Sequence, residues 1–241
     1  MYVNTRGVVI KETKVGDNDK ILTVFSEDLG KIRISARGAR RQGNRLSAVR
    51  LLCYASFTLF KSSKGYSLNE FELLNSFPAV SGSIESLSLA SYFSEIMCAV
   101  TQEKIADKRL LSLFLNSLYI ISENIIPLPQ IKAVFELKCA CLMGYEPQVS
   151  ECVICGCDAE SFSCSDGGTV CKKCRPSLSV IDKSTISVLG FICHSPDKKV
   201  FLFKVSDKIL CEISSICEEY LLSCVEFIPN SLEMYKKLVT I

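Results

Sequence analysis

Two pairs of cysteines stand at a spacing that is typical of a structural metal site. The first pair lies in CVICG, residues 152–156, and the second lies in CKKC, residues 171–174. Each C-x2-C turn brings two sulfurs to one side of a tight turn, so two turns supply four thiolates to one tetrahedral ion. Four thiolates leave no open position for water, so the site would be structural and not catalytic. We predict one Zn²⁺ bound by Cys152, Cys155, Cys171 and Cys174.

The remaining cysteines fit a different interpretation. The chain contains 14 cysteines, and Cys157 and Cys164 lie in the same loop without forming a second C-x2-C pair. We expect neither of them to bind the ion. Several others stand at apolar positions of helical patterns, where a reduced cysteine packs like a small apolar side chain. These are Cys98, Cys139, Cys141, Cys211, Cys217 and Cys224.

A second candidate site is the basic segment GKIRISARGARRQGNR, residues 30–45, which contains no acidic residue. The whole chain has a net charge of only +2, but residues 1–80 carry 13 Lys and Arg against 7 Asp and Glu. Clustered cations of this kind can track a phosphate backbone. The alternative is that the arginines form a solvated surface. The residues predicted to bind such a backbone are Lys31, Arg33, Arg37, Arg40, Arg41 and Arg45.

Motifs that would indicate an enzyme are absent from the sequence. There is no G-x-x-x-x-G-K-[ST] loop to hold nucleotide phosphates and no G-x-G-x-x-G turn after a strand. The single histidine, His194, lies in FICHSPD, which matches neither a catalytic triad nor a zinc hydrolase. The carboxylates are scattered and suggest no acid–base pair. We therefore expect a binding protein and not an enzyme.

The N-terminal region shows the pattern of five short strands, at residues 3–10, 21–25, 31–36, 55–60 and 66–73. Such a series indicates a small barrel, with the OB-fold as the leading candidate. Successive side chains of a strand point to opposite faces, so we expect Ile32 and Ile34 to face the core. Lys31 and Arg33 would then face outward together. The aromatic residues expected to fill the barrel are Phe57, Phe60 and Tyr66.

Helical spacing replaces the strand pattern after residue 78. Ser83 is placed to cap a first helix and Asp107 to begin a second one. Further helical patterns lie near residues 130–143, 182–193, 207–224 and 230–238. We predict a multi-domain α+β protein with an N-terminal OB-fold β-barrel, an α-helical body and an inserted four-cysteine zinc ribbon. The predicted domains are residues 1–78 (barrel), 79–149 and 177–241 (helical body) and 150–176 (ribbon).

These segments, in their order and spacing, resemble the RecO family of bacterial recombination mediators over nearly the whole chain. The N-terminal part of the resemblance is RGVVIKETKVGDNDKILTVFSEDLGKIRISARGARR, residues 6–41, followed by FELLNSFPAV, residues 71–80. SYFSEI, residues 91–96, resembles the first motif of the family's helical domain. The most specific piece is FELKCACLMGYEP, residues 135–147, which leads into CVICG, and GGTVCKKC at 167–174 also fits.

The resemblance implies a protein of DNA repair and homologous recombination that binds single- and double-stranded DNA and anneals complementary strands without ATP. RecO-like proteins act with RecR, and often with RecF, to load RecA onto DNA coated by single-strand-binding protein. The C-terminal tail of that coating protein usually contacts the helical domain. The sequence shows no signal peptide and no apolar stretch of about 20 residues, so we expect a cytoplasmic, nucleoid-associated protein.

Two features depart from the family pattern. In FIPNSLEMYKKL, residues 227–238, the chain has Asn230-Ser231 where family members often carry a Lys-Ser pair and more basic residues. The family pattern also leaves the extra cysteines unexplained. The residues alone leave two alternative functions open. One is a zinc-ribbon and OB-fold factor that binds RNA or acts in translation, and the other is an interaction scaffold with an incidental basic region.

Overall fold

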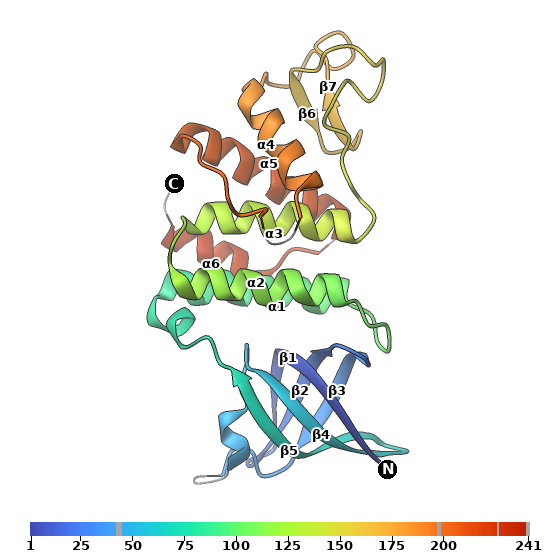
Figure 1. Cartoon of the computed structure of the whole chain (residues 1–241), viewed down its shortest axis with the longest axis vertical. Coiled ribbons are helices and arrows are strands. Elements are labelled where there is room, and N and C mark those ends of the chain that lie inside the picture. Colours follow the sequence, from blue (N-terminus) through green and yellow to red (C-terminus); the bar gives the residue numbers. More distant parts are fainter. Residues whose placement is uncertain (42–44, 197–198, 226, 240–241) are drawn as a thin grey trace. The chain divides into compact units, whose positions relative to one another are not determined.

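The computed structural model describes residues 1–41, 45–196, 199–225 and 227–239. The chain divides into two compact units, the first being Met1–Ser122 with Pro229–Leu238 and the second beginning at Glu123 and ending at Ile228, with the C-terminal residues from Val239. The first unit contains the barrel and helices α1, α2 and α6, and the second contains α3, α4, α5 and the ribbon strands (Figure 1). The four domain ranges expected from the sequence stay a prediction.

The first unit begins with a closed barrel of five strands. Neighbouring strands pair in the order β1-β2-β3-β5-β4, and β1 closes the barrel by pairing with β4. All pairings are antiparallel except the short parallel contact between β3 and β5. This is the OB-like barrel that the sequence predicts. The strands are β1 (Tyr2–Val15), β2 (Asp19–Ser26), β3 (Gly30–Ala36), β4 (Tyr54–Ser62) and β5 (Gly65–Asn75).

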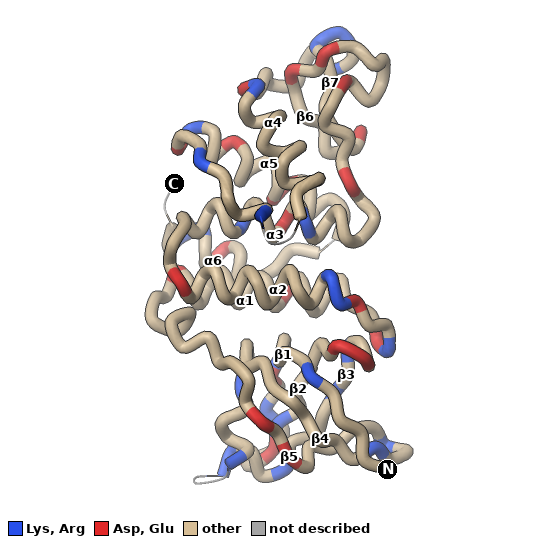
Figure 2. The backbone as a smooth tube through the Cα atoms, viewed as in Figure 1, with Lys and Arg blue, Asp and Glu red and all other residues tan. Residues whose placement is uncertain are grey.

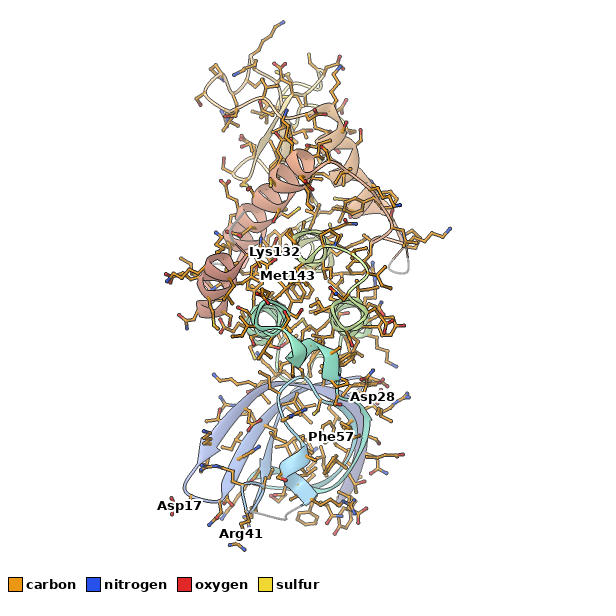
Figure 3. The ribbon with its side chains drawn as sticks, turned by 90° about the vertical axis from the view of Figure 1, so that its left-hand side faces the viewer. Asp17, Asp28, Arg41, Phe57, Lys132 and Met143 are labelled. Carbon is orange, nitrogen blue, oxygen red and sulfur yellow. The ribbon has the colours of Figure 1, made fainter. Side chains whose placement is uncertain are left out.

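Alternation along the strands sorts side chains between the barrel interior and its outer face. Ile32 and Ile34 lie in the interior cluster, as predicted. Phe57 is fully buried in the same cluster (Figure 3), and Tyr66 packs against it. The prediction for Phe60 is wrong, because this side chain follows an inward-facing neighbour and is 43% exposed.

The outer face of the barrel around β1 and the β2–β3 hairpin is covered by the helical part of the first unit. Val8 and Phe25 are partners on adjacent strands and are buried, although both alternate with interior residues. Lys31 ties the hairpin to helix α1 (Ile84–Val100) and the residues after it. Its amide donates to the Gln102 carbonyl at 3.2 Å, and its Nζ donates to the Cys98 carbonyl at 2.7 Å.

Local capping sets where the helices of this unit begin. The Ser83 Oγ accepts a hydrogen bond from the Ser86 amide at 3.1 Å and caps α1, as predicted. The Asp107 carboxylate accepts from the amides of Arg109 and Leu110, each at 2.9 Å, and so begins the second helix at the predicted place. The other elements of the unit are η1 (Arg45–Ala48), η2 (Pro78–Gly82), α2 (Lys108–Glu123) and α6 (Asn230–Leu238).

Helix α6 joins the first unit although it comes last in the sequence. Its first turn packs on α1, where the Ser231 Oγ donates to Glu95 Oε1 at 2.5 Å. The amide of Ser231 donates to Glu95 Oε2 at 3.4 Å, and Ser88 Oγ donates to the Ser231 carbonyl at 3.5 Å. The Asn230-Ser231 pair, which departs from the family pattern, therefore anchors this helix.

The second unit is built on three helices and a small two-stranded sheet. All three helices lie where the sequence predicts them. Within the described ranges, no helix combines the length and the apolar character needed to cross a membrane. The elements are α3 (Leu128–Leu142), α4 (Lys183–His194), α5 (Asp207–Val225), β6 (Ser161–Ser163) and β7 (Gly168–Val170).

A buried ionic cluster joins α3 to α5. Lys132 Nζ lies 3.0 Å from Glu136 Oε1 and 2.8 Å from Glu218 Oε2, and it donates to the Ser214 carbonyl at 3.5 Å (Lys132 is labelled in Figure 3). Burial lowers the pKa of Lys132, but the two carboxylates outweigh burial and raise the pKa above its ordinary value. Since the folded pKa is raised, the stabilisation is complete at neutral pH and is lost as the pH rises through that pKa.

Replacing Gly30 tests the close approach of the barrel to the residues after α1. Gly30 has a φ of +66°, and a Cβ there would lie 2.5 Å from the backbone of Ile105. Gly16 has a φ of +54° with open space around it, so Gly16→Ala keeps the backbone strain and lacks the clash. We expect Gly16→Ala to lower the free energy of unfolding by about 1 kcal/mol, and Gly30→Ala by roughly 1–3 kcal/mol more. Equal losses of unfolding free energy for the two variants, measured by urea denaturation, would contradict the close approach of Gly30 to Ile105.

Replacing Lys132 tests the buried ionic cluster. The Lys132 and Glu136 side chains are 3% and 0% exposed, so Lys132→Met would leave two carboxylates without their ammonium group. We expect the free energy of unfolding to fall by about 3–5 kcal/mol. Lys237→Met is the matched control, because Lys237 forms the same i,i+4 type of pair with Glu233 on the surface, where we expect no measurable loss. Denaturant midpoints compare the two, and similar midpoints would rule out a stabilising cluster.

Candidate metal centre and nucleic-acid surface

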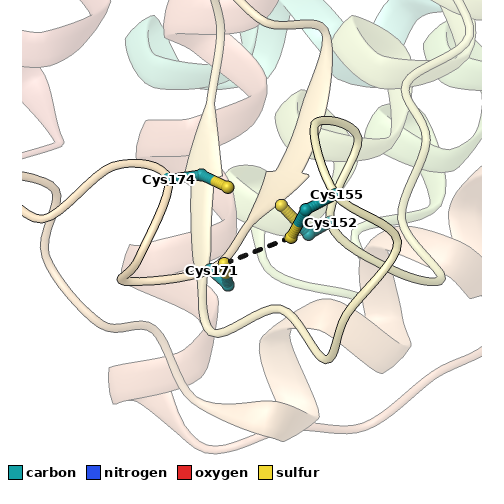
Figure 4. Close-up of side chains that lie close together, drawn as sticks. All are labelled: Cys152, Cys155, Cys171 and Cys174. Carbon is teal, nitrogen blue, oxygen red and sulfur yellow. Dashed lines mark hydrogen bonds between the residues drawn. The ribbon is translucent and has the colours of Figure 1, made fainter.

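The four predicted cysteines meet at one place in the second unit (Figure 4). Their sulfurs all lie within 4.8 Å of one another, and the Sγ atoms of Cys155 and Cys171 are 3.6 Å apart. A tetrahedral ion with metal–sulfur bonds of about 2.3 Å requires sulfur–sulfur distances of about 3.8 Å. The donor set therefore fits a tetrahedral site, and these four cysteines could hold one metal ion.

Each cysteine pair is held in a tight backbone turn. In the first turn the Gly156 amide donates to the Cys152 carbonyl at 2.8 Å, with a φ of +71° that glycine adopts without strain. In the second turn the amides of Cys174 and Arg175 both donate to the Cys171 carbonyl, at 3.1 and 3.0 Å. These turns bring the two sulfurs of each pair together.

The sulfurs of the cluster shift one another's pKa values. Burial raises the pKa of Cys152, but hydrogen bonds from the backbone of Cys171 and Cys155 outweigh it, and the pKa falls to about 6. Hydrogen bonding to Cys155, followed by burial, raises the pKa of Cys174 to about 12. Four sulfurs this close can all become thiolates only when a cation compensates their charge.

The ribbon around the cysteines has little apolar core of its own. Its buried cluster consists of Cys152, Val170 and Cys171, so two of its three members are predicted ligands. The backbone adds some order, because β6 pairs with β7 and the Thr169 amide donates to the Gln148 carbonyl at 2.8 Å. A bound ion would supply the cohesion that such a small core lacks.

The other two cysteines of this region lie outside the four-sulfur cluster. Within the described part of the chain, the cluster includes neither Cys157 nor Cys164. Cys157 is exposed, and burial together with the nearby Glu219 raises the pKa of Cys164 to about 12. Of the predicted core cysteines, Cys139 and Cys217 are buried. Those that are only half-buried are Cys98, Cys141, Cys211 and Cys224.

The basic segment lies on the barrel and on the chain that follows β3. Arg41 is placed at the end of the barrel away from α1 and α2, where Asp17 also lies (Figure 3), and Figure 2 shows both basic and acidic residues around this end. Residues 42–44 of the segment lie outside the described residues. Five of the six predicted cations are exposed and can reach a phosphate backbone, although Arg40 also donates to the Gly16 carbonyl at 2.9 Å. Their role in DNA binding stays a prediction. The exposed cations are Arg33, Arg37, Arg40, Arg41 and Arg45.

Lys31 is placed differently from the other five cations. It points away from the barrel interior, as predicted, but its side chain is half-buried and its ammonium donates to the Cys98 carbonyl of α1. Its primary contact is therefore inside the protein. A phosphate could recruit Lys31 only in competition with this hydrogen bond.

An exposed aromatic pair that was not predicted from the sequence lies on the outer face of the barrel. Tyr2 and Phe60 are cross-strand partners in β1 and β4, and their ring centroids lie 5.6 Å apart. Strand alternation could have predicted that Phe60 is exposed. Phe57 and Leu59 are both buried in the interior, so the residue after Leu59 must point outward. Nothing in the sequence alone indicated that Tyr2 would be its neighbour.

The fold and the two sites define an OB-barrel protein with a basic outer surface, a helical body and a four-cysteine ribbon. The chain matches the family model Recombination protein O N terminal over residues 1–77 and Recombination protein O C terminal over residues 81–233. This protein therefore belongs to the RecO family, which confirms the resemblance.

Individual relatives match along their full length. A protein of Acetivibrio thermocellus named DNA repair protein RecO is 36% identical over 244 residues, covering 98% of this chain and 97% of the relative. A protein of Alkaliphilus metalliredigens with the same name is 30% identical over 246 residues, covering 99% of this chain and 100% of the relative. A Clostridium perfringens protein of that name is also 30% identical, over 97% of both chains.

Removing the thiols tests the metal site. We expect the variant with Cys152, Cys155, Cys171 and Cys174 all changed to Ser to lose the bound metal, because hydroxyls bind such an ion far more weakly than thiolates. The ribbon should then become sensitive to proteases, since it has little core of its own. Cys157→Ser is the control, because this exposed thiol lies in the same loop outside the cluster. Metal analysis of both purified proteins gives the answer, and stoichiometric metal in the four-fold variant would place the ligands elsewhere.

Proposed function

We propose that this protein acts in DNA repair and homologous recombination, binding single- and double-stranded DNA and annealing complementary strands without ATP. Membership of the RecO family supports the proposal, since the relatives are named DNA repair proteins and the family models are described as recombination proteins. The observation that carries it is the set of exposed arginines on and after β3 of the OB-like barrel.

Annealing is a task that charge can perform without covalent chemistry. Two single strands repel each other through their phosphates, and bound cations reduce this repulsion while releasing condensed counterions. An OB-like barrel with exposed arginines supplies such cations on a rigid surface. No bond has to be broken and no nucleotide hydrolysed, which is consistent with the absence of a phosphate-binding loop from the sequence. We propose that the protein is not an enzyme.

We further propose that the ion at the four cysteines is Zn²⁺. Four thiolates in a tetrahedral arrangement are a donor set that zinc prefers, and they leave no position for a reacting water. When bound, the ion supplies folding energy, on the order of 10–16 kcal/mol in zinc-finger peptides. In this chain Cys152 and Cys171, already buried, would hold it from the ribbon's small core, and Cys155 and Cys174 would complete the site.

The partners proposed for the protein follow from its family. It would act with RecR, and with RecF, to help load RecA onto DNA coated by single-strand-binding protein, in the cytoplasm at the nucleoid. The acidic tail of the coating protein would contact the helical part of the chain. At the start of α6 Asn230 is uncharged and Ser231 is bound to Glu95, so that tail would have to find its cations elsewhere.

Strand annealing by the purified protein tests the proposal directly. We expect the full chain to accelerate annealing of short complementary oligonucleotides without ATP, measured by loss of donor fluorescence between labelled strands. The variant with Arg37, Arg40 and Arg41 changed to Glu should bind single strands at least about tenfold more weakly. The slope of log affinity against log salt should become shallower by about 0.7 for each phosphate contact that is lost.

The matched control changes three cations elsewhere in the first unit. Lys104, Lys108 and Arg109 are exposed and lie beside or within α2, and changing them to Glu alters the net charge by the same amount. We expect this control to keep most of the affinity and the salt slope. No acceleration over a protein-free reaction would contradict the proposed function. Equal affinities for the two variants would place the DNA surface away from the basic segment.

A further inference from the structure

We propose that the exposed aromatic pair Tyr2–Phe60 is a stacking site for the unpaired bases of single-stranded DNA. This inference rests on the proposed function and adds a base-binding site to the phosphate-binding arginines. The pair lies on β1 and β4, away from the basic strand β3. It would let the protein distinguish an unpaired strand, whose bases are open, from a duplex.

Exposure is the first observation that supports the site. Tyr2 is 61% exposed and Phe60 is 43% exposed, although aromatic side chains of this size are usually buried. The two residues pair across the antiparallel strands, which fixes both side chains on the outer face of the barrel. The rings are therefore held in place by the sheet while their surfaces remain open to solvent.

The geometry of the two rings leaves a flat surface for a base. Their centroids lie 5.6 Å apart and their planes form an angle of 66°, so the edge of one ring meets the face of the other. An edge-to-face pair covers only one of its four ring faces, and an exposed face accepts a base of any identity by stacking. The site would thus bind single strands without sequence preference.

The end of the barrel that carries the pair also carries exposed lysines. Lys61 and Lys64 are exposed at the end of β4 and in the turn between β4 and β5, but Lys61 lies on the other side of β4 from Phe60, where its Nζ is 5.9 Å from the centre of the Tyr66 ring. The acidic residues Glu70 and Glu72 of β5 share this outer face but pair with Thr58 and Ser56, which lie farther from the turn than Phe60. The cations available to a strand bound at the pair would therefore come from this turn and from the basic segment, and cations combined with aromatic faces bind single-stranded nucleic acid.

The position of the pair on the barrel agrees with the basic segment. The N-terminus and the β4–β5 turn lie at the end of the barrel away from α1 and α2 (Figure 1), and Arg41 also lies at that end (Figure 3). A single strand crossing this end could place phosphates on the arginines and bases on the aromatic pair. The two contacts would then act on the same strand through different parts of each nucleotide.

Separate substitutions of the two rings test the inference. We expect Tyr2→Ala and Phe60→Ala each to weaken binding of a thymidine oligonucleotide by about tenfold, which corresponds to about 1.4 kcal/mol and lies within the range for one stacked base. Binding of an abasic oligonucleotide of equal length should not change, because it has no base to stack. Tyr119→Ala is the matched control, since Tyr119 is 51% exposed on α2.

A fluorescence measurement avoids any dependence on loss of stability. The chain contains no tryptophan, so Phe60→Trp introduces a single indole at the site. We expect saturating single-stranded DNA to quench this fluorescence strongly, while the Tyr119→Trp control changes little. Sedimentation of Tyr2→Ala and Phe60→Ala should show the same mass as the unchanged chain.

The outcomes separate this inference from the proposed function. Unchanged affinity of both alanine variants, or an unquenched indole at saturating DNA, would overturn the stacking site while annealing by the full chain still stood. A change of sedimenting mass without a change in DNA affinity would also overturn it, because the rings would then join two copies of the chain. Failure of the unchanged protein to bind or anneal single strands would remove the proposed function and the stacking site together.

Discussion

Closure of the barrel is the constraint on which the arrangement of the other features depends. Strand β1 forms hydrogen bonds along both of its edges, with β2 and with β4, so the barrel has no free edge at this strand. In a closed barrel every strand residue must face either the packed interior or the outside. This rule sends Ile32 and Phe57 inward. It sends Arg33 and Phe60 outward, which creates the basic and aromatic surfaces.

The two units use their polar side chains in different ways. In the first unit Lys31 is used as a donor to α1, and the Ser231–Glu95 contact fixes α6, so polar side chains fasten helices to the barrel and to each other. In the second unit Lys132 satisfies two carboxylates inside the helical packing. The ribbon has only a small buried core. Its four sulfurs lie close enough together to hold a metal ion, which would stabilise the ribbon in place of a larger core.

The proposed activity would use these features together and would require no reactive centre. Arginines outside the barrel would neutralise phosphates, the aromatic pair would hold unpaired bases, and the closed four-sulfur site would keep the ribbon folded. Electrostatic binding alone would favour any polyanion. Stacking of exposed bases on the aromatic pair would add selectivity for single strands.

The sequence alone determined the features that depend on local spacing. Two C-x2-C turns identified the four sulfurs, alternation placed Ile32 and Ile34, and the capping residues Ser83 and Asp107 located two helix starts, because each signal lies within a few residues of chain. Contacts between distant segments were decided only by the tertiary structure. Packing turned the Lys31 ammonium from solvent to α1, brought Ser231 to Glu95, and placed Tyr2 beside Phe60. Each of these contacts joins two segments that lie far apart in the sequence. No local or periodic pattern of residues predicts such a contact, so it exists only in the folded chain.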